Sequence, residues 1–418
     1  MDGSDDTTGN RIINISVQIP GLSAFYWETI DTKTASQDAV GYVSVVEPVL
    51  LDLLDGDTSK VNGLVTDTNS TMRSFHREMA KRPGFSHVFY TLCDSHGFQL
   101  LIKDIVKAEP YKTTMANVSK ITTWFKKSKL QLAFLRQHQL RAYGKKKALV
   151  ASVITRWGTQ LQALHSVLGN KEALLAWARD GLTVQKTPSR SHAALFDIIG
   201  NVQNHVFWRE VEVEVLATVL GPIGAVQERS ESDKLNVGHT LMNWRQIAAN
   251  WCQLRNSGEW LEVDWDPLFT KLASREEIQT LDIHVTAWAL DPTTRYTSLS
   301  IQQLTCVEAF LQEFSPASSW PKVRSQFTQF RAQDGPHFSM GSATLNSGET
   351  PYEFWLRLST TDLELAHVAK RILSTLANSV PSERSFSATK FLQNKVRNRL
   401  TPETTNHAAF LFINAKVL

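Results

Sequence analysis

Hydrophobic and polar residues alternate near the start of the chain. In the segment RIINISVQI, Arg11 to Ile19, Ile and Val recur at every second position, with Asn, Ser and Gln between them. This period of two predicts a half-buried β-strand. Pro20-Gly21 marks a turn, and the aromatic segment AFYWET, Ala24 to Thr29, predicts a second strand. The two strands are expected to form an antiparallel hairpin.

Helical and strand patterns then follow one another. Apolar residues at helical spacing predict a helix over Ser36–Leu54, and short apolar runs predict strands at Val61–Thr66 and His87–Leu92. Further helices are expected over Asn69–Lys81 and His96–Lys107. This mixture of strands and helices predicts a layered α/β domain rather than a helical bundle.

Strand patterns fade from about Lys112 to Glu277, where the chain is expected to form successive helices, for example Leu161–Arg179 and Phe207–Val226. The segment Ser315–Thr350 is rich in Ser, Pro, Gly and Thr, and is predicted to be a linker. Two more helices are expected at the C-terminal end, over residues 361–375 and 402–412.

Composition limits the class of protein. The chain has 418 residues, 42% of them hydrophobic, which suffices for one large core or two to three smaller ones. It contains no apolar run of roughly 18 residues that would predict a membrane span, and its first residues lack the pattern of a secretory signal. Three scattered cysteines predict a reducing compartment, with neither a disulfide framework nor a four-ligand zinc site.

Charge is concentrated in one part of the chain. The net charge is only +3, yet the segment Lys103–Arg156 contains thirteen Lys and Arg residues against two acids. A basic segment on a nearly neutral protein is typical of a surface that follows a nucleic-acid backbone. The alternative is a helix face that is merely solvated.

Three places carry candidate chemistry. Asp67 follows the short apolar strand of LVTDTNSTM, where a sheet edge would hold a metal-binding carboxylate. Taken alone, Asp67 is better explained as the cap of the next helix. Cys93 and His96 lie between a strand and a helix, and packing roles are the alternative. Glu383 stands among small polar residues in SVPSERSFS, where an exposed helix is the alternative.

These blocks occur in the order found in the hAT superfamily of DNA transposases, which the chain resembles in pieces over most of its length. The matching strings are DGSDDTTGNRIINISVQIPG, LVTDTNSTM, TLCDSHGFQLLIKDI, ITRWGTQLQAL, LGPIGAVQERSESDKLN and the region from YEFWLRL to FINAKVL, in which ANSVPSERSFS and RNRL are the most specific.

The resemblance implies an α/β, RNase H-like mixed sheet interrupted by a large all-helical insertion. Residues 1–110 would form the first part of that domain and residues 111–340 a basic helical segment with the insertion. Residues 341–418 would form a dimerisation region that completes the core. Homodimers or higher homo-oligomers, DNA as partner and a nuclear location are implied as well.

The resemblance also implies a catalytic site. Asp2, Asp67 and Glu383 would hold magnesium or manganese for phosphodiester cleavage and strand transfer, and His96 would help to orient the DNA. Further residues are candidates for contact with DNA: Cys93, Lys126, Lys127, Lys145, Lys146, Lys147, Arg156, Trp157 and Arg384.

The chain departs from the family pattern in two ways. It shows no BED-type zinc finger, and Asp2 follows only Met1, whereas the family's first acid ends a central strand. We therefore expect a chain truncated at its N-terminus, with Asp2 on a mobile end and impaired catalysis. Two alternatives remain open: an inactive, dimeric, transposase-derived protein that associates with DNA, and a helical scaffold for protein interactions.

Overall fold

The computed structural model of the chain describes residues 1–5, 9–152, 158–184, 193, 195, 198–199, 208, 213–232, 235–339, 344–392 and 401–415. The chain divides into two compact units. Unit 1 comprises Met1–Gly97, Ser230–Trp244 and Glu276–Leu418, and unit 2 comprises Phe98–Arg229 and Arg245–Arg275.

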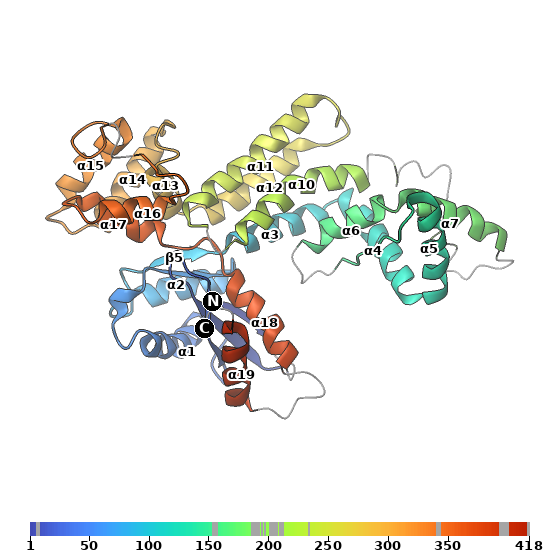
Figure 1. Cartoon of the computed structure of the whole chain (residues 1–418), viewed down its shortest axis with the longest axis horizontal. Coiled ribbons are helices and arrows are strands. Elements are labelled where there is room, and N and C mark those ends of the chain that lie inside the picture. The colour runs from blue at the N-terminus through green and yellow to red at the C-terminus, as the bar shows by residue number, and fades with distance from the viewer. Residues whose placement is uncertain are drawn as a thin grey trace. The chain divides into compact units, whose positions relative to one another are not determined.

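Unit 1 contains two small sheets (Figure 1). Strands β1 (Asp2–Asp5), β2 (Arg11–Val17) and β3 (Phe25–Asp31) pair antiparallel in that order, and Ile13 lies opposite Ile30. Strands β4 (Gly63–Thr66) and β5 (Phe89–Leu92) pair in parallel. The hairpin and both later strands predicted from the sequence are confirmed.

One face of the three-stranded sheet is covered by α1 (Ala39–Leu53) and the neighbouring α2 (Ser70–Ala80). Their apolar faces bury Val43, Val46 and Phe75 against Ile13 and Ile15 of β2 in one core cluster. Apolar and polar residues alternate along β2 because its Ile residues face the core, as the sequence predicted.

The other side of β2 and β3 packs against the two last helices, α18 (Val380–Leu392) and α19 (Pro402–Asn414). Polar side chains fix this layer. Asn14 of β2 donates to the hydroxyl oxygen of Ser385 at 2.5 Å, and the Asn414 amide bonds both the N–H and the C=O of Tyr26. The C-terminal helices are thus part of the same α/β layers as the first strands.

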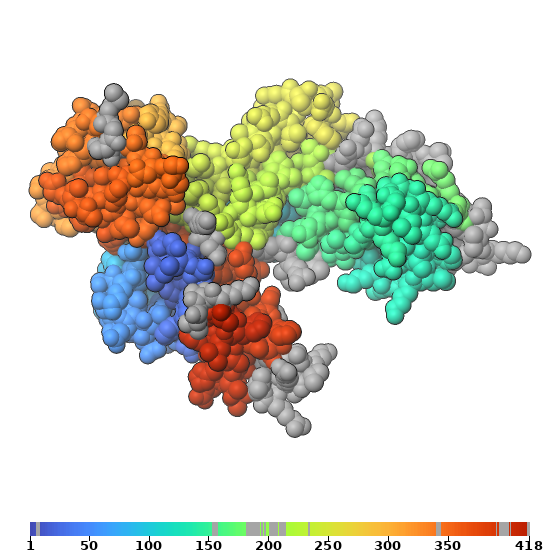
Figure 2. Space-filling view, in the orientation of Figure 1, coloured from blue at the N-terminus to red at the C-terminus, as the bar shows by residue number. Residues whose placement is uncertain are grey.

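A second core in unit 1 is helical. It gathers Phe89 of β5 with buried residues of α13 (Asp282–Leu290), α14 (Ile301–Glu313), α15 (Trp320–Ala332), α16 (Pro351–Leu358) and α17 (Glu364–Leu373). In Figure 2 the surface of these helices, in orange, is continuous. Residues 276–339 therefore belong to unit 1, whereas the sequence grouped them with the helical insertion.

The predicted linker Ser315–Thr350 is wrong over about a third of its length, because α15, with its 13 residues, lies within it. Val323, Phe327 and Phe330 recur at helical spacing and are buried in the second core. The Ser, Pro and Gly residues that suggested a linker lie mostly outside this helix, on either side of it. The segment forms a helix because burial of its one apolar face stabilises it, whatever the composition of its flanks.

In the part of unit 2 that the structure describes, every element is a helix, as the sequence predicted for this region. The helices that lie wholly or partly in unit 2 are α3 (Asp94–Val106), α4 (Tyr111–Lys127), α5 (Lys129–Tyr143), α6 (Thr159–Leu168), α7 (Lys171–Val184), α10 (Val213–Ser230), α11 (Gly238–Ser257) and α12 (Trp265–Gln279). Aromatic residues hold them together: Phe125 and Trp124 both meet Trp177 edge to face. None of the helices described has the length and apolarity needed to cross a membrane.

Candidate functional site

Two of the three predicted acids lie at the ends of strands, one in each of the two sheets. Asp67 directly follows β4, and Asp2 begins β1, where it lies opposite Asn14. The Met1 amino group donates to the carbonyl oxygen of Val65 at 2.8 Å, and the N–H of Gly3 donates to the Asp2 carboxylate. The expectation of Asp2 on a loose end is therefore wrong, because ladder pairing and the contact with β4 hold it.

The third acid, Glu383, is positioned by hydrogen bonds of the segment that precedes its helix. The segment 375–379, which precedes α18, lies beside the end of β5. The N–H of Asp94 donates to the carbonyl oxygen of Ala377 at 2.9 Å, and the N–H of Ser379 donates to the Cys93 sulfur at 3.3 Å. These bonds fix the start of α18, so Glu383, in its first turn, lies near the strand ends.

The three carboxylates influence one another electrostatically. Burial raises the pKa of Asp2 to about 7, and repulsion by Asp67 adds to the rise. Burial raises the pKa of Glu383 to about 8, with further repulsion from Asp2 and Asp67. Burial opposes ionisation of Asp67 too, yet His96 and the amino terminus hold its pKa below the ordinary value. Such coupling needs short distances.

His96 is the direct neighbour of Asp67. Its Nδ1 atom lies 3.2 Å from Oδ1 of Asp67, and both side chains keep partial access to solvent, at 19% and 24% exposed. Asp67 does not cap the next helix, because the Asn69 side chain accepts from the N–H of Met72 instead. The alternative explanation of Asp67 as a helix cap is therefore excluded.

The spacing of the acids sets a limit on the site. Among the residues that the structure describes, no group of three His, Cys, Asp or Glu side chains is close enough to hold a metal ion. The donor chemistry suits a hard divalent cation, because carboxylate oxygens are the ligands that such a cation prefers. The three carboxylates therefore influence one another, but their side chains are not close enough together to coordinate one metal ion.

Two residues beside the site differ from the sequence-based picture. Cys93 is fully buried and its pKa is raised to about 12 by that burial, so the prediction that it touches DNA is wrong. Glu231, which the sequence did not single out, adds repulsion that raises the pKa of Glu383. Glu231 lies within the family-like string LGPIGAVQERSESDKLN, but no local pattern in that string places it near Glu383.

The basic candidates fall into two places. Lys126, Lys127, Lys145 and Lys146 are exposed in unit 2, whereas Lys147 is half-buried and its Nζ donates to the carbonyl oxygen of Gly169 at 2.8 Å. Arg384 lies exposed on α18 in unit 1 and donates to the carbonyl oxygen of Glu231 at 3.0 Å. Arg156 and Trp157 lie outside the described residues.

A basic groove in unit 2 collects part of this charge. It has a volume of about 920 Å³ and lies between the end of α4, α5, the segment 146–151 and the start of α6. Lys126, Arg136, Lys146 and Lys147 line it, together with the apolar Leu132 and Leu149. Arg136 was not among the predicted contacts, because only the packing of α4 against α5 brings it to the lysines.

The apolar residues near the C-terminus separate into core and surface. Leu363, Leu365 and Ile372 are fully buried, so they serve the second core. Leu411 and Phe412 of α19 remain 63% and 52% exposed. Phe412 also stacks on Phe391, at 5.8 Å between ring centroids. An exposed apolar surface therefore lies at α18 and α19.

A comparison with known protein families gives a match to the C-terminal part of the chain. Residues 333–415 match the family model of the hAT family C-terminal dimerisation region. This span contains α16 to α19, and so includes both Glu383 and the exposed residues of α19. No curated protein matches the chain.

Asp94 gives this site a testable pH dependence. It is fully buried, and burial raises its pKa to about 8, although Thr240 and Gln279 lower it in part. The folded protein then keeps a proton that the unfolded chain loses above about pH 4, so the free energy of unfolding should fall as the pH rises from 4 to 8, by up to about 1.4 kcal/mol per pH unit.

The replacement Asp94→Asn should remove the contribution of this one proton to the slope of the free energy of unfolding against pH. Urea unfolding of both proteins between pH 5 and 8 measures it. The same slope in both proteins would show that Asp94 is ionised in the folded state. Asp362→Asn is the control, because that side chain is 90% exposed and should leave the slope unchanged.

Proposed function

We propose that this hAT transposase-like protein, whose residues 333–415 are a hAT family C-terminal dimerisation region, binds DNA and cleaves and joins its strands in a metal-dependent reaction. The observation that carries the proposal is the convergence of Asp2, Asp67 and Glu383, which are far apart in sequence and shift one another's pKa. An RNase H-like arrangement of the α/β layers around them is part of the proposal.

The three carboxylates would supply the oxygen ligands for magnesium or manganese. When bound, such ions make a water or a DNA 3′-hydroxyl nucleophilic and stabilise the leaving oxygen of a phosphodiester. Because the described side chains do not form a closed three-ligand group, metal and DNA would have to draw them together. The raised pKa values of Asp2 and Glu383 mean that cation binding would also release protons near neutral pH.

His96 in unit 1 and the basic groove in unit 2 have distinct roles in this proposal. His96, 3.2 Å from Asp67, would fix the direction of that carboxylate and meet the DNA from its partly exposed side. The basic groove of unit 2, with Lys126, Arg136 and Lys146, would hold the phosphate backbone without reading its sequence.

Self-association follows from the dimerisation region, and we place its contact surface on α18 and α19. Leu411 and Phe412 are apolar side chains that solvent surrounds in the single chain. Burial of such groups removes apolar surface from water and so favours association. A DNA substrate in turn implies a nuclear location for the protein.

One observation favours a second function. The open spacing of the acids suits an inactive relative that keeps the basic groove and the dimerisation region while lacking turnover. Both functions share DNA binding, so only the cleavage assay separates them.

Nicking of supercoiled plasmid with magnesium or manganese tests the catalytic proposal. Asp67→Asn and Glu383→Gln should each lower the nicking rate at least about 100-fold, because each removes a charge needed in the transition state. Asp362→Asn, at an exposed carboxylate away from the site, should nick like the parent protein. Equal nicking by all four proteins would trace the activity to a contaminant, and absence of nicking in the parent would support the inactive relative.

DNA affinity measured at several salt concentrations tests the basic groove. Replacing both Lys126 and Arg136 by Ala should weaken binding and reduce the slope of log affinity against log salt by about 1 to 2, since each neutralised phosphate contributes about 0.9. Lys322→Ala removes an exposed charge in unit 1 and is the matched control. An unchanged slope in the double variant would exclude the groove as the DNA contact.

A further inference from the structure

A buried glutamine lies beside the acidic site and has no role in the functions proposed above. Gln279 is the last residue of α12, and the last turn of that helix, Glu276–Gln279, belongs to unit 1. Its side chain is only 1% exposed, although glutamine is mostly found at protein surfaces. A polar side chain that is excluded from water needs hydrogen-bond partners inside the protein, and these partners indicate what it does.

The Gln279 amide joins the two segments that carry Asp67 and His96. Its Oε1 atom accepts a hydrogen bond from the hydroxyl of Thr68 at 2.7 Å, and Thr68 directly follows Asp67. Its Nε2 atom donates to the carbonyl oxygen of Cys93 at 3.0 Å, and Cys93 stands three residues before His96. One planar amide thus connects the turn after β4 with the start of α3.

The close fit of Gln279 against α3 depends on a glycine. A Cβ atom at Gly97 would lie 2.6 Å from Nε2 of Gln279 and 2.8 Å from its Cγ, so a larger side chain would displace the amide. The N–H of Gly97 donates to the carbonyl oxygen of Cys93 as well, at 3.0 Å. Gly97, the residue after His96, therefore lets the glutamine approach the start of the helix.

An amide satisfies both partners, whereas other side chains of this length would not. A carboxylate could accept from the hydroxyl of Thr68, but it has no hydrogen to donate to the carbonyl oxygen of Cys93. An apolar side chain would leave both groups without this partner, in a place where Thr68 is 9% and Cys93 0% exposed. The two hydrogen bonds therefore restrain the turn after β4 and the start of α3 relative to each other.

We propose that Gln279 is a positioning residue, which keeps the Asp67 carboxylate beside the His96 ring, where Oδ1 and Nδ1 are 3.2 Å apart. It acts through Thr68 and Cys93, the neighbours of this pair along the chain. The inference rests on the proposed function, because the pair belongs to the acidic site that would hold the metal ion. Displacement of a catalytic group by about 1 Å can lower a rate about 100-fold, so this restraint bears on catalysis.

NMR spectra of the protein without metal or DNA test whether Gln279 positions the pair. The ring nitrogen signals of His96, from protein labelled with ¹⁵N in histidine, report the contact with Asp67, and Asp67→Asn gives the signal of the unpaired ring. At one fixed pH, Gln279→Met and Thr68→Val should each move the His96 signal towards that of Asp67→Asn, because each breaks the connection through the amide. Thr68→Ser keeps the hydroxyl and should give the signal of the parent protein.

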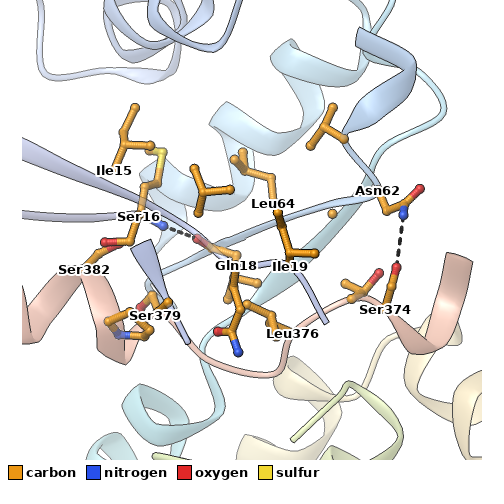
Figure 3. Close-up of a pocket in the computed structure, with 18 of the residues that line it drawn as sticks. Ile15, Ser16, Gln18, Ile19, Asn62, Leu64, Ser374, Leu376, Ser379 and Ser382 are labelled. Atoms are coloured by element: carbon orange, nitrogen blue, oxygen red, sulfur yellow. Dashed lines mark hydrogen bonds between the residues drawn. The ribbon is translucent and has the colours of Figure 1, made fainter. Parts of the chain in front are cut away.

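A matched control removes a similar bond at the other end of β4. Asn62, which directly precedes β4, donates from its amide to the hydroxyl oxygen of Ser374 at 3.1 Å (Figure 3). Ser374→Ala removes this bond between an amide and a hydroxyl. It should leave the His96 signal in place, because the bond restrains the start of the strand and not the end that carries Asp67.

Nicking kinetics give a second readout, which a residue that only stabilises the fold would not change. Measured below the unfolding transition, Gln279→Met and Thr68→Val should lower kcat at least about tenfold and leave KM for DNA within about twofold, because the basic groove stays intact. Thr68→Ser and Ser374→Ala should nick like the parent protein.

Three results would overturn the proposal. The first is a His96 signal in Gln279→Met and Thr68→Val that coincides with that of the parent. The second is an equal displacement in Thr68→Ser and Thr68→Val, and the third is an equal displacement in Ser374→Ala and Gln279→Met. If Gln279→Met does not fold, the comparison of Thr68→Val with Thr68→Ser decides alone. If the parent does not nick DNA, the nuclease proposal fails, whereas the NMR comparison still decides the role of Gln279.

Discussion

The hydrogen bonds between the segment 375–379 and residues 93 and 94, which directly follow β5, are the constraint on which the rest of the site depends. They fix the start of α18, and so place Glu383 near Asp67 although some three hundred residues separate them. Without these bonds the carboxylates would move apart, because like charges in a partly buried place repel. The folded layers thus hold the three carboxylates near one another, although their mutual repulsion does not stabilise the folded state.

Repulsion among the three carboxylates contributes to their unusual pKa values. Asp67 is held in its ionised form by His96, whereas Asp2 and Glu383 are pushed towards protonation. Perturbed carboxylates at one sheet end are a common mark of functional sites, since a structural role seldom requires them. A divalent cation would relieve the repulsion between these carboxylates. The fold that holds them close together would therefore favour binding of the cation that the proposed chemistry requires.

Much of the α/β layering could be predicted from the sequence, because the alternation in β2 and the apolar spacing in α1 and α2 report burial directly. α15 was missed because its Ser- and Pro-rich flanks dominated the composition. The meeting of Asp67 and Glu383 came from family resemblance, as no local pattern encodes a contact so distant in sequence. Arg136, Asp94 and the burial of Cys93 follow from packing alone, which the sequence does not display.

Calorimetric titration of manganese into the parent protein and Asp67→Asn at pH 7 tests the shared acidic site most directly. The account predicts that the parent binds the cation and releases protons, seen as heat that varies with the buffer, while Asp67→Asn binds at least about tenfold more weakly. Equal affinity in both proteins, or no binding by the parent, would contradict it.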